Sequence, residues 1–185
     1  MSNIFFASDH HFFHENILTF VSSYNSGRLV RPEFKTVEEM NEHMIDCHNK
    51  VVGVQDKFYC LGDVLMGKKN LAILARLNGH KRLILGNHDG GDIKMSMYEP
   101  YFQKIMESRR MGNILFTHRP VLLGPTETRV LANVHGHIHE QNIDSDKRYL
   151  NISVERISYT PISLDDIIKE LKSRGIEADA ALQDS

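Results

Sequence analysis

The chain has 185 residues, 41% of them hydrophobic and 25% charged, which is typical of one globular domain with a substantial core. Its net charge of −2 does not favour a general nucleic-acid-binding protein, because such proteins usually carry a strong basic excess. With no signal-peptide pattern, no apolar run long enough to span a membrane, and only Cys47 and Cys60, the sequence predicts a cytoplasmic protein without membrane association.

The first half of the chain alternates predicted strands with predicted helices. β-Branched and aromatic residues mark the strands, and apolar residues at helical spacing mark the helices. In chain order we predict a strand at 3–11, a helix at 37–51, a strand at 56–63, a helix at 68–80 and a strand at 81–89. Such alternation is typical of α/β domains.

The second half is predicted to contain mainly strands. The predicted elements are a helix at 92–108 broken near Pro100, strands at 113–118, 130–139 and 148–156, and a helix at 163–175. Residues 176–185 are expected to be a frayed tail. Because strands dominate after about residue 112, we expect a second sheet packed on the first, within one domain over residues 1–185.

Five of the predicted strands end in residues that commonly bind metal ions. In order these ends read D-x-H (9–11), G-D (62–63), G-N-H-D (86–89), a single His118 and G-H-x-H (136–139). Ligand sites of open α/β sheets lie at the carboxyl ends of strands, so these residues are expected to converge. Imidazole and oxygen ligands without thiolates suit Mn²⁺, Fe or Zn²⁺.

Three histidines occupy alternate positions in the segment VHGHIHE (134–140). Alternate residues of an extended strand share one face, which predicts that His135, His137 and His139 point the same way. His137 and His139 are expected to reach metal ions, whereas His135, further back, is expected to pack or to support the ligands. His10 is expected to point away from them, and His48 is expected to be solvated.

Together and in this order, the five motifs resemble those of the calcineurin-like metallophosphoesterase superfamily over residues 9–139. The resemblance implies a two-sheet αββα sandwich with its active site at the C-terminal ends of strands. It implies a first metal ion bound by Asp9, His11, Asp63 and His139, and a second bound by Asp63, Asn87, His118 and His137. Asp63 would bridge two divalent ions, with Mn²⁺ favoured and Fe, Zn²⁺ or Ni²⁺ as alternatives.

The reaction implied by the resemblance is hydrolysis of a phosphate ester by metal-activated hydroxide. Two divalent ions would outweigh the charges of Asp9 and Asp63, and the resulting positive surplus suits an anionic ester. His88 is expected to protonate the leaving oxygen or to stabilise the phosphate oxygens, with Asp89 orienting its ring. The expected substrate is a small phosphodiester or phosphomonoester, including nucleotides, and the sequence does not indicate an oligomeric state.

The stretch DHHFFHENIL resembles a small bacterial and phage branch of the superfamily that lacks a capping domain. In that branch the first motif continues as D-x-H-F-x-H-x-N, which implies that His14 and Asn16 contact the substrate phosphate; a role at a helix start is the alternative. Arg31 and Arg119 are further substrate-binding candidates, because arginine can bind phosphate with two hydrogen bonds. Substrate selection is expected from loops 20–36, 89–98 and 119–129.

Two other functions stay open on the sequence. A nuclease acting on DNA or RNA would need an extended basic groove, which the net charge does not favour. A non-catalytic metal-dependent binding module would typically lack the catalytic histidine or several ligands, whereas His88 and every expected ligand are present. The chain departs from the frequent G-D-x-x-D pattern, since Met66 replaces the second acid, a position that is not a metal ligand in the resemblance.

Overall fold

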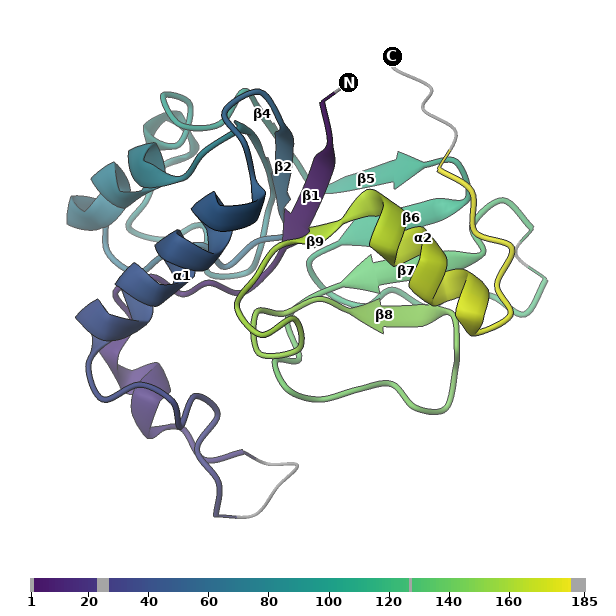
Figure 1. The fold of residues 1–185 in the computed structure, drawn as a ribbon, viewed down its shortest axis with the longest axis horizontal. Helices are drawn as coiled ribbons and strands as arrows, with labels where there is room; N and C mark the ends of the chain where they lie inside the picture. Colours follow the sequence, from purple (N-terminus) through teal and green to yellow (C-terminus); the bar gives the residue numbers. More distant parts are fainter. Residues whose placement is uncertain (1, 23–26, 127, 181–185) are drawn as a thin grey trace.

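The computed structural model describes residues 2–22, 27–126 and 128–180, which form an α/β fold with two mixed sheets (Figure 1). The first sheet has the order β4-β3-β2-β1-β9 and contains β1 (Ile4–Ala7), β2 (Lys57–Cys60), β3 (His80–Ile84), β4 (Lys104–Met106) and β9 (Ile162–Ser163). Its strands β1 to β4 pair in parallel, and β9 pairs antiparallel with β1. The architecture is compatible with the expected sandwich.

The second sheet has the order β5-β6-β7-β8. Its strands are β5 (Ser108–Met111), β6 (Ile114–Thr117), β7 (Ala132–His135) and β8 (Tyr149–Asn151). β5 and β6 form an antiparallel hairpin, whereas β6, β7 and β8 are parallel. The loops that follow the parallel strands of each sheet therefore lie at the same edge of that sheet.

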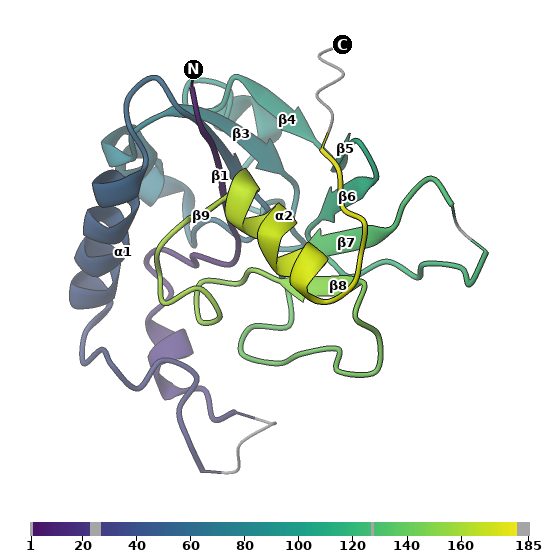
Figure 2. The ribbon, with the colours of Figure 1, turned by 45° about the vertical axis from the view of Figure 1, so that its right-hand side comes forward.

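Alternating residues of β1 and β2 build two hydrophobic clusters on opposite faces of the first sheet. Phe5 and Phe58 belong to the cluster shared with α1 (Val37–Val51), whereas Phe6 and Tyr59 belong to the cluster shared with the second sheet. The ring of Phe6 stacks on Phe116 of β6, with centroids 4.3 Å apart, so the two sheets pack face to face. Figure 2 shows α1 alongside the first sheet. Helix α2 (Leu164–Ser173) follows β9 directly, and its buried residues belong to the cluster shared with the second sheet.

Two predicted helices form as expected. Helix α1 begins after Thr36, whose side chain accepts a hydrogen bond from the Glu39 N–H, and Ser163 caps α2 in the same way. None of the helices in the described residues is long and apolar enough to cross a membrane. The remaining helical segments are short 3₁₀ helices: η1 (Glu15–Thr19), η2 (Lys68–Arg76) and η3 (Met95–Met97).

Two other predictions need correction. The helix expected at 68–80 is the 3₁₀ helix η2, which ends at Arg76 before the chain becomes extended at Leu77. The helix expected at 92–108 is wrong, because only η3 is helical there and the chain enters β4 and then β5. Pro100 disfavours a continuous helix, and pairing with β3 favours the extended chain at 104–106.

The start of the expected frayed tail is also wrong. Residues 176–180 pack against the fold: Ala178 is 1% exposed, and the backbone N–H of Asn113 donates to the Asp179 carbonyl at 2.9 Å. This segment covers the cluster between the sheets, which is why it is ordered. The rest of the expected tail, residues 181–185, lies outside the described residues.

Candidate metal centre

The predicted ligands lie on loops that follow five strands, and the ladder hydrogen bonds continue into these loops. The Asp9 N–H donates to the Gly62 carbonyl and the His11 N–H to the Asp63 carbonyl, both at 3.0 Å, so the loops after β1 and β2 run side by side. On the second sheet, the Gly136 N–H donates to the His118 carbonyl at 2.9 Å. Pairing of backbone segments distant in sequence thereby assembles the site.

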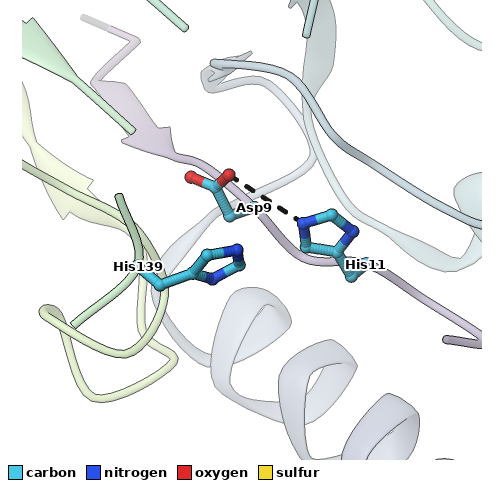
Figure 3. Close-up of side chains that lie close together, drawn as sticks. All are labelled: Asp9, His11 and His139. Atoms are coloured by element: carbon cyan, nitrogen blue, oxygen red, sulfur yellow. Dashed lines mark ion pairs between the residues drawn. The ribbon is translucent and has the colours of Figure 1, made fainter. Parts of the chain in front are cut away.

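The described residues contain two groups of side chains that could each hold a metal ion, and both were expected as ligands. We call the group of Asp9, His11 and His139 the first cluster (Figure 3). One ligand atom from each of these residues lies within 4.8 Å of the others. His11 Nε2 is 4.0 Å from Asp9 Oδ1, and the rings of His11 and His139 stack at 5.2 Å.

The second cluster consists of Asp63, His118 and His137. One ligand atom from each of these residues again lies within 4.8 Å of the others. His118 Nε2 is 3.3 Å from Asp63 Oδ2, and the rings of His118 and His137 have centroids 5.0 Å apart. Asn87, the fourth ligand expected here, places its Oδ1 3.0 Å from His118 Nε2. The structure thus brings together all four residues expected around the second ion.

The Asp63 carboxylate lies between the two clusters. Its Oδ2 is 3.7 Å from His11 Nε2 in the first cluster and 3.3 Å from His118 Nε2 in the second. Its Oδ1 accepts a hydrogen bond from the His88 backbone N–H at 2.8 Å, which fixes the carboxylate. This placement is the one expected of a bridging ligand.

The backbone of the site is strained. Five of the seven expected ligands have φ in the left-handed region: Asp9 (61°), His11 (50°), Asp63 (50°), His137 (71°) and His139 (50°). Non-glycine residues adopt this conformation rarely, and such strain concentrates at functional sites. Gly136 is needed for a related reason, because a Cβ there would overlap Ser8 and the Asp9 carboxylate.

The second ring nitrogens of two histidines have fixed partners. His118 Nδ1 lies 2.8 Å from the Leu61 carbonyl, and His139 Nδ1 lies 2.9 Å from Glu155 Oε1. Both partners can only accept, so each Nδ1 carries a hydrogen, and the neutral form of each ring would present the Nε2 lone pair to a metal ion. Metal-binding histidines are typically oriented in this way.

The charges and unpaired atoms of the site fit a cation. Among the described residues, Asp9 Oδ1 and both ring nitrogens of His11 are buried without a hydrogen-bond partner. Burial lowers the pKa of His11 well below its usual value, so its ring is neutral. Burial opposes ionisation of Asp63, but His118 and the His88 N–H outweigh it and hold the Asp63 pKa at about 2. Buried acceptors facing one another are stabilised by a cation among them.

Three further expected residues surround the clusters. The His88 side chain is 53% exposed, with its Nε2 4.0 Å from Asp63 Oδ2. Exposed Arg119 donates from Nε to Asn87 Oδ1 at 3.3 Å. The His14 ring lies 5.5 Å from the His11 ring. These residues lie where a molecule bound at the clusters could contact them, whereas Asn16 is exposed on η1 with its carbonyl bonded to Thr19.

Asp89 does not have its expected role. Within the described part of the chain, no hydrogen bond joins it to the His88 ring. Its buried carboxylate instead accepts from the backbone N–H groups of Asp63, Val64 and Gly86 at 2.7–2.9 Å. Asp89 therefore fastens the loop after β3 to the loop after β2, because its side chain points into the fold and not towards the His88 ring.

Arg31 is also placed differently from the prediction of a substrate contact. Its side chain is 0% exposed, and its guanidinium donates to the carbonyls of Asp9 and His10 at 2.6 and 2.8 Å. It also forms an ion pair with Glu155 at 2.8 Å. Its donors are therefore directed at the backbone of the turn that carries Asp9, so Arg31 supports this turn and does not face a substrate.

The structure tests the predictions made for the remaining histidines. β7 ends at His135, so His137 and His139 lie in the following loop and not on one strand face as predicted. His135 is buried, as expected of a packed residue, with its Nδ1 2.9 Å from the Gly136 carbonyl. His10 packs on Phe12 away from the clusters. The prediction for His48 is wrong, since it is 1% exposed.

Sequence reasoning missed two supporting residues, Ser153 and Glu155. Ser153 Oγ donates to Asp9 Oδ2 at 2.9 Å, beside the His137 N–H, which donates to the same oxygen at 2.8 Å. Glu155 follows an apolar strand in NISVER, where a buried acid is unusual. That position was the available signal for its role.

Three cavities are lined by residues of the site or of its support, and each includes residues from one of the expected specificity loops. A cavity of about 790 Å³ reaches Glu155 and includes Arg28 and Phe34 from loop 20–36. A second, of about 250 Å³, combines His88 with residues 90–93. A third, of about 580 Å³, includes His118 and Arg119. The surroundings of the site therefore offer room for a small molecule.

Comparison with known proteins identifies relatives but no activity. No family model matches the chain. The crystal structure of the Protein of Unknown Function AQ665 from Aquifex aeolicus has a TM-score of 0.67 and 28% identity, over 91% of this chain and 99% of that one. The Gene 66 protein of Mycobacterium phage L5 is 34% identical over 95 residues, which are 49% of this chain and 41% of that protein. The uncharacterized protein MJ1445 of Methanocaldococcus jannaschii is 33% identical over 184 residues, 91% of each chain. The chain belongs to the same protein family as MJ1445.

Proposed function

We propose that this protein is a metal-dependent phosphoesterase of the calcineurin-like metallophosphoesterase type. Its substrate would be a small phosphate ester, and the reaction would be hydrolysis of a P–O bond. The observation that carries the proposal is the pair of ligand clusters with the Asp63 carboxylate between them. Sites of this kind place two ions where they can bind the attacking and leaving oxygens of an in-line displacement.

The donor set supports two divalent ions, with Mn²⁺ favoured and Fe, Zn²⁺ or Ni²⁺ as alternatives. Asp9, His11, Asp63 and His139 would hold one ion, and Asp63, Asn87, His118 and His137 would hold the other. When bound, such ions lower the pKa of coordinated water and neutralise charge on phosphate oxygens. We expect the enzyme to act in the cytoplasm, since its two cysteines are free thiols.

The chain's own residues would position and protonate the substrate. His88 is exposed and lies beside Asp63, so its ring can reach the leaving oxygen or an equatorial phosphate oxygen. Arg119 and His14, at the edge of the clusters, can donate hydrogen bonds to the remaining phosphate oxygens. The adjoining cavities can accept one or two ester substituents, so both monoesters and diesters fit the proposal.

A metal-supplemented substrate screen tests the proposal. The protein would be assayed with Mn²⁺ against phosphomonoesters, phosphodiesters, cyclic nucleotides, and single- and double-stranded nucleic acids. We expect turnover of a small ester that chelation with EDTA abolishes and Mn²⁺ restores. Activity confined to nucleic acid would favour the nuclease, and bound metal without turnover of any substrate would favour a binding module.

The variant His88→Ala separates catalysis from metal binding. We expect kcat to fall by about 10²–10⁴-fold, the usual contribution of a general acid, with the metal content unchanged. His80→Ala is the matched control, because His80 begins β3 whereas the site follows the end of that strand. An unchanged rate in His88→Ala would reject the role of His88.

A further inference from the structure

Arg31 bonds the backbone of the turn that presents the ligands of the first cluster. It lies 22 residues from Asp9 in the chain, yet its guanidinium donates to the Asp9 and His10 carbonyls at 2.6 and 2.8 Å. These carbonyls flank the strained turn, in which Asp9 has a φ of 61° and His11 a φ of 50°. Charge-assisted hydrogen bonds to both carbonyls stabilise a conformation that the residues adopt only at a cost.

Glu155 connects Arg31 to the opposite ligand of the first cluster. Its Oε1 lies 2.8 Å from Arg31 Nη2, 2.9 Å from Arg31 Nε and 2.9 Å from His139 Nδ1. The Glu155 side chain is 3% exposed, and the buried Arg31 guanidinium faces it as a counter-charge. An ionised carboxylate on Nδ1 orients the His139 ring and makes Nε2 a stronger donor to a metal ion.

The second cluster is supported by different groups. His118 is oriented by the Leu61 backbone carbonyl, and the loop that presents Asp63 is held by Asp89. The Arg31 guanidinium contacts Glu155, Met40 and the carbonyls of Asp9 and His10, all on the side of the first cluster. Among the described residues, different side chains therefore support the two clusters, although the His11 N–H donates to the Asp63 carbonyl and the His137 N–H to Asp9 Oδ2.

We propose that the buried Arg31–Glu155 pair positions the first cluster and sets its affinity for a metal ion, with a much smaller effect on the second cluster. The inference rests on the proposed two-ion site and deepens it by assigning unequal, separately tuned affinities to the two ions. Arg31 and Glu155 are positioning residues, because they act through Asp9, His11 and His139. Their charges balance each other, so the pair can be buried without leaving an unpaired ion.

Metal titration tests the inference without relying on activity. Protein stripped of metal would be titrated with Mn²⁺ and followed by calorimetry and by electron paramagnetic resonance of the bound ion. In Glu155→Gln we expect one of the two ions to bind about 10–100-fold more weakly, the usual effect of losing a partner that orients a ligand. The other ion should bind within about threefold of its wild-type affinity.

Two further variants guard against an effect of misfolding. Glu155→Gln leaves Arg31 buried without its counter-charge, so Arg31→Met/Glu155→Gln removes both charges together and is expected to fold. It should show the same selective loss of one ion. Arg31→Lys keeps the charge but loses the forked geometry, and its affinity for that ion should be intermediate. Thermal unfolding of each variant would establish that it is folded before titration.

The matched control is an exposed Arg–Glu pair of the same type. Arg76 and Glu42 form an ion pair at 2.6 Å with side chains about half exposed, on η2 and α1. Arg76→Met/Glu42→Gln should leave both metal affinities unchanged. Folded pair variants that bind both ions as tightly as the wild type, or that lose both equally, would overturn the inference. Failure of the wild type itself to bind two ions would instead reject the proposed function.

Discussion

The two clusters have similar ligands with similar burial, but they differ in the residues that border them and in what holds them. Asp9 and His11 of the first cluster are as deeply buried as Asp63 and His118 of the second, at no more than 4% exposure. The turn of the first cluster is held by the buried Arg31–Glu155 ion pair. The second cluster borders exposed residues, since Asn87 and Arg119 meet His118 there and exposed His88 lies nearby. The first cluster is therefore distinguished by its buried support, and the second by the exposed polar residues that border it.

Removing the residue between the clusters should have the largest effect. In Asp63→Ala both ion sites lose a ligand, so we expect the metal content to fall from two ions to none and activity to fall by more than about 10³-fold. Metal analysis after gel filtration, together with steady-state kinetics, would measure this. If the variant kept two ions, Asp63 would not be a bridge and the clusters would be independent.

Weakening the support of the second cluster should produce the opposite selectivity to Glu155→Gln. Asp89→Asn loses acceptor capacity for the three backbone N–H groups that Asp89 now binds. We expect the free energy of unfolding to fall by about 1–3 kcal/mol and one ion to bind about tenfold more weakly. Denaturant unfolding and Mn²⁺ titration of Asp89→Asn would check both values. In the double variant Asp89→Asn/Glu155→Gln we expect a lower affinity for both ions. A lower affinity for only one ion would show that the two supports act on the same site.

The smallest effect is expected for the exposed arginine beside the second cluster. Arg119→Ala removes a donor for phosphate oxygens but no expected ligand, so KM should rise by about tenfold with kcat nearly unchanged. Steady-state kinetics on the substrate found in the screen would measure it, with Arg110→Ala on β5 as an exposed control. A fall in kcat at constant KM would instead place Arg119 in the chemical step.

The convergence of the expected ligands was predictable, because their positions at strand ends follow from local rules. Each expected ligand follows a short apolar strand, and parallel pairing brings the ends of neighbouring strands together. All seven expected ligands therefore lie in or beside the two clusters. The sheets were predictable for the same reason. The segment 92–108 was not predictable, because its apolar residues have helical spacing but its chain pairs with β3, and such pairing depends on tertiary structure.

The supports of the clusters were not predictable from local patterns. Arg31 and Glu155 are 124 residues apart, and neither belongs to a motif of fixed spacing. Asp89 is the opposite case. Its position next to His88 in the sequence predicted a contact with the His88 ring, but the backbone turns its side chain towards other loops. Neighbouring motifs identify the ligands, whereas the groups that orient them depend on how distant loops pack.

The positive φ angles at five of the expected ligands affect how mutations at these positions change the stability of the fold. A residue at such a position gains stability if it becomes glycine, because glycine adopts positive φ without a steric penalty. His11→Gly should therefore be more stable than His11→Ala, the reverse of the usual order. Mutational drift towards glycine at these positions would stabilise the fold while it removed the expected ligands, so under the proposed function selection on activity would be needed to keep these side chains in place.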